Sequence, residues 1–150
     1  MELNSDARPV TYRGVIHAWH LDHMGHMNVQ HYVGMFDHGT WVLFSMMGLD
    51  AAWFREQNRG MAALEQNIQY KRELHAGDVI EIRSGLVELG EKTVRIFHEM
   101  RHSSGGWVAA QTTILGVYFD TAVRKSLAIP DPIRQKAQTF LIADAQKMPG

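Results

Sequence analysis

One stretch decides the fold of this chain: Trp19-His-Leu-Asp-His-Met-Gly-His-Met-Asn-Val-Gln-His-Tyr32, followed by largely apolar residues as far as Gly48. Asn28 is a good helix N-cap, because its side-chain oxygen can accept a hydrogen bond from an amide of the first turn. The apolar residues after it recur at helical spacing and leave little of the helix polar. They are Val29, Tyr32, Val33, Met35, Phe36, Val42, Leu43, Met46 and Met47. We therefore expect a buried helix from Val29 to Met47, ended by Gly48 in the left-handed conformation.

Two glycines, Gly34 and Gly39, lie inside this predicted helix. Each costs the helix about 1 kcal/mol relative to alanine. We expect that both allow a sheet to approach the helix backbone closely.

Asp22 is the candidate catalytic residue of the loop before the helix. The amides of Val29 and Gln30 are predicted to be free, with the positive end of the helix dipole behind them, so they can polarise a carbonyl oxygen. A nearby carboxylate can attack that carbonyl or take a proton from water, and a thioester suits both routes because its thiolate leaves with little help from an acid. The alternative is an aspartate that only caps a turn. We favour catalysis because the loop is apolar and close to the helix start.

The spacing of Asp22, Gly25-His26, Asn28 and Tyr32 resembles the signature Asp-x-x-Gly-His-x-Asn-x-x-x-Tyr of hotdog-fold acyl-CoA thioesterases, in their 4-hydroxybenzoyl-CoA thioesterase-like branch. The resemblance implies an α+β hotdog fold, in which a five-stranded antiparallel sheet of order 1-3-4-5-2 wraps around a long central helix. It implies hydrolysis of an acyl-CoA to a free carboxylic acid and coenzyme A. Asp22 would be the nucleophile or general base, and the Val29 amide would bind the oxyanion. Many members carry a second Asp where this chain has His20, so the acyl group is not indicated.

The remaining segments read as strands joined by polar turns. The predicted strands are Val10–Trp19, Met61–Tyr70, Val79–Leu89, Thr93–His102 and Trp107–Phe119, with hairpin turns at 90–92 and 103–106. Asp50 is expected to cap a short helix, Ala51–Gln57, while Asp131 and Pro132 are expected to open a C-terminal helix over Ile133–Ala145. One sheet and one apolar helix predict a two-layer domain that spans residues 1–150.

Composition limits the function classes. The chain has 150 residues, 45% of them hydrophobic, which is enough for one core. A net charge of -1 without a run of basic residues argues against nucleic acid as a partner. The absence of cysteine excludes disulfides and thiolate catalysis. The polar segment 1–9 lacks the apolar core of a signal peptide and no apolar run is long enough for a membrane span, so we expect a cytoplasmic protein that does not use a membrane.

The histidines raise the possibility of a metal site. Of the nine, His20, His23 and His26 surround Asp22 in sequence, and His31 and His38 follow on the helix. Their spacing matches no His-Glu-x-x-His motif, so we expect no metal and no cofactor beyond the coenzyme A of the substrate. His26 is expected to hold the loop or to contact substrate.

Other residues are weaker candidates. Asp37 is a reserve catalytic acid, because another branch of hotdog thioesterases uses an acid in the middle of the central helix; its simpler role is that of a helix-face residue bonded to nearby groups. Glu65, on a predicted strand, is weaker still. Basic side chains at strand ends are expected to meet the phosphates of coenzyme A. These are Lys71, Arg72 and Lys92, with Arg83, Arg95 and Arg101 as further possibilities, and Trp19, Trp41, Trp53, Phe54 and Trp107 are candidate acyl-pocket aromatics.

Two other functions stay open, a hotdog hydratase or dehydratase and a non-catalytic acyl-CoA binding module. The first would need a histidine paired with an acid at a different spacing. A single sheet also leaves an exposed edge, which stable proteins usually cover. We therefore expect a homodimer or homotetramer whose sites lie between subunits, with one subunit contributing Asp22 and the other the region 61–70.

Overall fold

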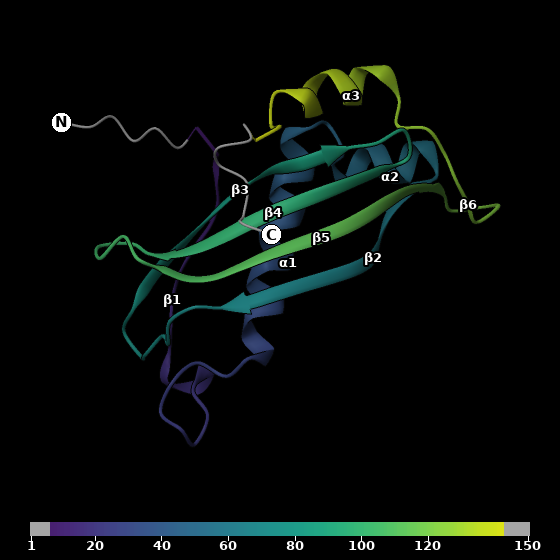
Figure 1. Ribbon diagram of the computed structural model, residues 1–150. Coiled ribbons are helices and arrows are strands. Elements are labelled where there is room, and N and C mark those ends of the chain that lie inside the picture. Colours follow the sequence, from purple (N-terminus) through teal and green to yellow (C-terminus); the bar gives the residue numbers. More distant parts are fainter. Residues whose placement is uncertain (1–6, 143–150) are drawn as a thin grey trace.

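The computed structural model describes residues 7–142. An antiparallel sheet curls around the long helix α1, and its strands follow the order β1-β3-β4-β5-β2 (Figure 1). The elements are β1 (Val10–Val15), a 3-10 turn (Ala18–His20), α1 (Gln30–Met46), α2 (Ala51–Gln57), β2 (Arg59–Tyr70), β3 (Val79–Leu89), β4 (Thr93–His102), β5 (Val108–Asp120), β6 (Lys125–Ser126) and α3 (Asp131–Gln138). The hotdog fold and the strand order implied by the family resemblance are confirmed, with the short β6 paired to β5 as an addition.

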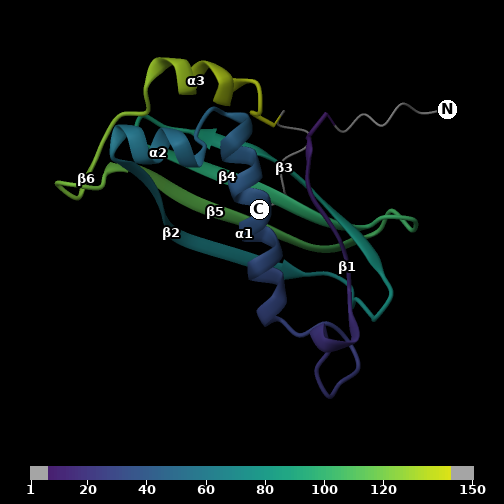
Figure 2. The same cartoon turned by 180° about the vertical axis from the view of Figure 1, so that it is seen from behind.

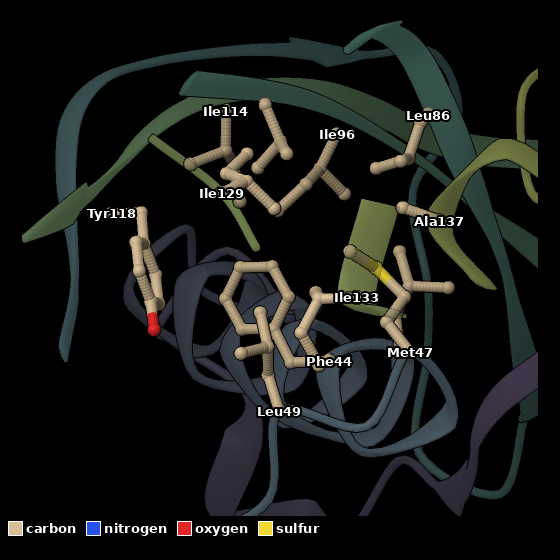
Figure 3. Close-up of a cluster of buried hydrophobic side chains, with 12 residues drawn as sticks. Phe44, Met47, Leu49, Leu86, Ile96, Ile114, Tyr118, Ile129, Ile133 and Ala137 are labelled. Carbon is tan, nitrogen blue, oxygen red and sulfur yellow. The ribbon is translucent and has the colours of Figure 1, made fainter. Parts of the chain in front are cut away.

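α1 crosses the concave face of the sheet (Figure 2). The core around its C-terminal half joins α1 to the sheet and to α3 (Figure 3). Its buried members include Phe44, Met47, Leu86, Ile96, Ile114, Tyr118, Ile133 and Ala137. A second core packs the N-terminal half of α1 against β3 and the preceding loop, through Ile16, Met27, Tyr32, Phe36, Leu74, Ile80 and Ile82 among others. The predicted stripe is therefore buried at Tyr32, Met35, Phe36, Leu43 and Met47. The prediction is wrong for Val29, Val33 and Met46, which are 57%, 45% and 40% exposed.

Element ends differ from the predictions at β1 and α3. β1 stops at Val15 rather than Trp19: the Ile16 amide still donates to the Asp78 carbonyl at 2.8 Å, and the chain then leaves the sheet in the 3-10 turn Ala18–His20. α3 stops at Gln138, whereas the prediction ran to Ala145, of which 143–145 lie outside the described residues. The chain after α3 instead forms a parallel bridge to Leu86 of β3. Sequence periodicity carries no signal for either contact.

The strand β2 begins at Arg59, two residues before the prediction, and contains a bulge between Ala63 and Glu65. The bulge breaks the alternation of the strand, and Leu64 is 59% exposed. Among residues 7–142, no helix is long and apolar enough to cross a membrane.

The two glycines inside α1 have different surroundings. A Cβ added at Gly39 would lie 2.9 Å from Thr11 Oγ1, so the expected close approach of the sheet is confirmed there. A Cβ added at Gly34 would meet no heavy atom within 4 Å outside its own turn, so the same prediction is wrong for Gly34. Gly48 follows the helix with φ of 92°, the left-handed conformation that its sequence position predicts.

A buried chain of hydrogen bonds attaches the middle of α1 to the sheet. The Thr40 hydroxyl donates to the Phe36 carbonyl at 3.1 Å and lies 2.8 Å from Nε2 of His98. Nδ1 of His98 is hydrogen-bonded to the Ser84 hydroxyl, whose oxygen lies 2.6 Å from Thr11 Oγ1, and Thr11 also donates to the Ile82 carbonyl at 3.4 Å. Both ring nitrogens of His98 are thus engaged, and burial lowers the pKa of His98 to about 3.

Candidate active site

Residues 21–27 form a closed turn, the Asp22 loop, at the end of the molecule opposite α3 (Figure 1). An antiparallel bridge between Leu21 and Met27 closes the loop, and the Asp22 amide donates to the His26 carbonyl at 3.2 Å. Gly25 turns the chain with φ of 86°, which side chains rarely adopt. The Met27 amide donates to the carbonyl of buried Leu74 at 2.8 Å, which anchors the loop to the segment after β2.

The Asp22 carboxylate is held at both oxygens. Oδ2 accepts from Nδ2 of Asn28 at 2.9 Å, and Oδ1 accepts from the Met24 amide at 2.8 Å. The hydrogen bond from Asn28 and then that from Met24 lower the pKa of Asp22, and the histidines His26 and His23 lower it further. Asp22 is therefore ionised at neutral pH, the state that both a nucleophile and a general base require. The bond from Met24 also makes the turn that the simpler interpretation of Asp22 predicts.

Asn28 connects this carboxylate to the start of α1. Its Oδ1 accepts from the Gln30 amide at 3.0 Å, as expected of an N-cap, although regular helix begins only at Gln30. The Gln30 amide is consequently occupied, and the expectation of two free amides is wrong for that residue. The Val29 amide, directly after Asn28 in the chain, donates to no acceptor among residues 7–142. The helix start thus offers one unoccupied N–H, at Val29, next to the residue that holds Asp22.

A cavity of about 190 Å³ lies between the start of α1 and the end of β2. It is bordered by His26, Met27, Val29, Tyr32, Tyr70, Lys71, Arg72 and Glu73. His26 Nε2 lies 3.6 Å from a carboxylate oxygen of Glu73, which supports the loop-holding role. Tyr32 packs edge-on against Tyr70 at 5.1 Å, and burial, followed by Tyr70 and Glu73, raises the pKa of Tyr32 to about 12. Tyr32 therefore stays protonated and can only donate its hydroxyl hydrogen or accept at its oxygen.

The basic candidates separate into three groups. Lys71 and Arg72 border the cavity at Val29, and the Arg72 guanidinium lies 4.1 Å from the ring centre of Trp107. Lys92 lies in the turn between β3 and β4. The backbone carbonyl of the residue before it, Glu91, accepts a hydrogen bond from Arg134 of α3. Because α3 lies at the other end of α1, one chain does not bring Lys92 to the Asp22 loop (Figure 1). The remaining arginines, Arg83, Arg95 and Arg101, form ion pairs with glutamates on the sheet.

Asp37 lies on the exposed face of α1, where Nε1 of Trp41 donates to its Oδ2 at 3.2 Å. Eight residues of helix separate it from Val29, or about 12 Å at 1.5 Å per residue. A single chain therefore does not place Asp37 at the Val29 amide. Glu65 of β2 is exposed and lies 3.6 Å from Arg95 of β4, in an ion pair that spans the intervening strand β5.

Asp37 instead borders a second cavity, of about 270 Å³, between α1 and β2. The cavity is lined by Val33, Gly34, Asp37, Thr40, Trp41, Phe44, Met61, Ala62, Ala63, Gln66, Ile96, Ile114 and Gly116. Of the predicted acyl-pocket aromatics, only Trp41 borders it, with Phe54 behind at 6.0 Å between ring centres. Sequence reasoning missed the small residues that open this space, because a glycine or alanine in a regular element is usually a packing residue.

The histidines near the loop stack on one another. Nδ1 of buried His20 accepts from the His17 amide at 2.8 Å, and its ring packs edge-on against His31 at 4.9 Å. Burial, followed by the charges of His31 and His17, lowers the pKa of His20. In the described part of the chain, no group of three or more histidine or carboxylate side chains is arranged to hold a metal ion.

The chain is similar to known proteins both in sequence and in fold. The chain is 25% identical over 130 residues to the long-chain acyl-CoA thioesterase FadM of Escherichia coli, covering 84% of this chain and 95% of FadM. It is 24% identical over 119 residues to L-carnitine dehydrogenase/betainyl-CoA thioesterase of Rhizobium meliloti, of which it spans only 24%. A Staphylococcus aureus protein solved in complex with CoA has the same fold, with a TM-score of 0.82 at 18% identity over 92% of this chain and 87% of that one. A family model described as the thioesterase-like superfamily matches residues 16–137, so the chain belongs to this superfamily and is a thioester hydrolase.

Proposed function

We propose that this chain hydrolyses acyl-CoA thioesters to a free carboxylic acid and coenzyme A at the junction of the Asp22 loop and α1. One observation carries the proposal: Asn28 holds the ionised Asp22 carboxylate and is followed directly by Val29, whose amide has no acceptor among residues 7–142. The superfamily, the acyl-CoA activity of FadM and the coenzyme bound to the Staphylococcus aureus structure support coenzyme A as the thiol part of the substrate.

The chemistry begins at the thioester carbonyl, whose oxygen accepts a hydrogen bond from the Val29 N–H. The positive end of the α1 dipole stabilises the negative charge that develops on this oxygen. In one route, an Asp22 oxygen bonds to the carbonyl carbon and the C–S bond breaks, which leaves a mixed anhydride that water hydrolyses. In the other, Asp22 takes a proton from the water that attacks the carbon. Both routes release the thiolate of coenzyme A, and both need Asp22 ionised.

The surrounding residues have binding roles in this scheme. The cavity between α1 and the end of β2 would hold the part of coenzyme A next to the sulfur, with the Tyr32 hydroxyl as a donor. Lys71 and Arg72 border the same cavity and would pair with phosphate oxygens at its exposed end. Lys92 could join such a site only from another subunit. No step requires a metal ion or a further cofactor.

A thiol-release assay on a panel of acyl-CoA thioesters tests the proposal. We expect saturable release of coenzyme A together with one equivalent of free acid. Hydration of an enoyl-CoA without thiol release would instead identify a hydratase. Tight binding of acyl-CoA without either product would identify a binding module.

A further inference from the structure

The cavity between α1 and β2 extends to Gly34, where no side chain covers the helix backbone. Gly34 lowers helix stability relative to alanine, yet the chain places nothing over it: an added Cβ would meet no heavy atom within 4 Å outside its own turn. Gly34 borders this cavity and two further hollows on the surface of α1. The described residues thus leave an open space over Gly34, and close packing does not explain the glycine at this position.

Val33 and Gly34 are the cavity-lining residues of α1 that lie nearest to Val29 along the helix. Val29, Val33, Asp37 and Trp41 follow one another at intervals of four residues, so they form one stripe on α1. At 1.5 Å per residue, Gly34 is about 7.5 Å and Trp41 about 18 Å along the axis from Val29. An acyl chain whose carbonyl is held at Val29 would pass over Gly34 before it reaches Trp41.

The polar side chains that line the cavity already have partners within the protein. The Thr40 hydroxyl is engaged by His98 and the Phe36 carbonyl, and Nε2 of Gln66 donates to Thr112 at 3.3 Å. The Asp37 carboxylate accepts from Trp41, and its exposure at the rim keeps its charge hydrated. A pocket that selects a hydroxylated acyl group instead presents polar atoms that need the substrate for a partner.

The remaining walls are apolar. They consist of Val33, Trp41, Phe44, Met61, Ile96 and Ile114, with Ala62, Ala63 and Gly116 as the small residues on the sheet side. Trp41 packs edge-on against Phe44 at 5.8 Å and against Phe54 at 6.0 Å, which fixes its ring at the far end of the stripe. Apolar walls bind an apolar ligand chiefly because the complex removes apolar surface from water.

We infer that this cavity binds an unsubstituted aliphatic acyl chain, which crosses α1 over Gly34 and ends at Trp41. The inference rests on the proposed function for the position of the thioester carbonyl. It assigns the substrate class as aliphatic acyl-CoA, in preference to hydroxylated aromatic or cationic acyl groups. Gly34 is then a specificity-determining residue, because its missing side chain leaves the path open.

Kinetics on a homologous series of saturated acyl-CoA thioesters tests the substrate class, with 4-hydroxybenzoyl-CoA and betainyl-CoA as comparison substrates. We expect kcat/KM to rise about fourfold per added methylene until the cavity is filled, the equivalent of about 0.8 kcal/mol per buried CH₂. A higher kcat/KM for 4-hydroxybenzoyl-CoA or betainyl-CoA than for every aliphatic substrate would overturn the inference.

The variant Gly34→Leu tests the path. A leucine in the open space should lower kcat/KM for chains that pass Gly34 by at least about tenfold, the scale of an overpacking cost, and leave butyryl-CoA within about twofold. Ala52→Leu adds similar volume to the exposed surface of α2 and should change neither value. An equal loss for short and long chains would count against the path. So would a change in the molecular mass of Gly34→Leu in solution, since it would show that a second copy of the chain fills the space.

Binding of S-alkyl-CoA thioethers, measured by calorimetry, separates this inference from the proposed function, because thioethers are not hydrolysed. Affinity that rises with alkyl length in the wild type and not in Gly34→Leu supports the cavity assignment even if no acyl-CoA is turned over. Turnover of acyl-CoA without any dependence on chain length, in kinetics or in binding, would leave the hydrolase proposal standing and overturn the aliphatic assignment.

Discussion

Asn28 is the residue through which the candidate chemistry and the fold are connected. Its amide nitrogen holds Asp22 and its amide oxygen caps the first turn of α1, so the carboxylate and the Val29 amide keep a fixed relation. These residues lie within eight positions of one another, so local spacing was sufficient to predict that they lie close together, while their catalytic roles stay predictions. The Gln30 amide was wrongly predicted to be free because a sequence does not show which amide a cap will take.

Replacement of Asp22 tests the chemistry most directly. We expect Asp22→Asn to fold and to lower the rate of thioester hydrolysis by at least about 100-fold, the scale of a lost acid-base or nucleophilic group. Steady-state thiol release at neutral pH measures the effect. Asp37→Asn is the matched control, since Asp37 lies about two helical turns away from Val29. If Asp37→Asn were inactive and Asp22→Asn active, the catalytic carboxylate would have been assigned to the wrong element.

The hydrogen bond from Asn28 should also appear in the pH profile. Asn28 is the largest cause of the lowered pKa of Asp22, so Asn28→Ala should move that pKa upward. Because the ionised form is required, the acid limb of kcat/KM should shift to higher pH in the variant. The lost cap should cost about 1 kcal/mol of folding stability, measured separately by denaturant unfolding. An unchanged acid limb would mean that the limb reports a group other than Asp22.

His98 should make the fold sensitive to acid. Its pKa is about 3 in the folded protein and near 6.5 when unfolded, so only the unfolded state binds this proton between those values. The contribution to stability is therefore fully present above pH 6.5 and falls by about 1.4 kcal/mol for each pH unit below it, down to about pH 3. Urea unfolding of wild type and His98→Gln across this range should show a shallower pH dependence in the variant. His75→Gln, at an exposed position, is the control and should retain the wild-type dependence.

At the level of elements, regular segments were predictable and their ends were not. α1, α2, β3 and β4 follow from periodicity and local caps, including Asp50, which accepts from the Trp53 amide at 2.9 Å. β1 ends before the 3-10 turn Ala18–His20, and the chain after α3 pairs with Leu86, which is distant in sequence. The lining of the cavity between α1 and β2 combines residues from α1, β2, β4 and β5, so no local sequence pattern predicts it.

The two glycines of α1 provide a matched pair within one helix. Gly34→Ala should raise the free energy of unfolding by about 0.5–1 kcal/mol, because alanine favours helix and the space is open. Gly39→Ala should lower it by about 1–3 kcal/mol, because the new methyl group would lie 2.9 Å from Thr11 Oγ1. Denaturant unfolding of both variants against wild type measures the difference. Equal shifts in the same direction would show that helix propensity alone, and not the surroundings, decides both positions.

On the scale of the whole molecule, one face of the chain is unusually apolar. Val29, just before α1, is 57% exposed, and Leu64 and Tyr70 on β2 are 59% and 50% exposed. β2 is also an edge strand, paired with β5 on one side only. Open edges and clustered apolar side chains of this kind mark interfaces. We propose that two copies of the chain meet at this face, beside the cavity between the start of α1 and the end of β2 that Val29 borders.

A charged residue on this edge should separate the copies. We expect the wild type to scatter light as at least a dimer of the 17.1 kDa chain and Leu64→Lys to shift toward the monomer, because a lysine on an edge strand opposes pairing. If the site needs both copies, thiol release should fall with the dimer. Val123→Lys is the control: Val123 is 63% exposed in the turn before β6, outside this face, and its replacement should change neither mass nor activity. A wild-type chain that is fully active at 17.1 kDa would refute both the interface and the shared site, since every catalytic contact would then have to lie within one copy.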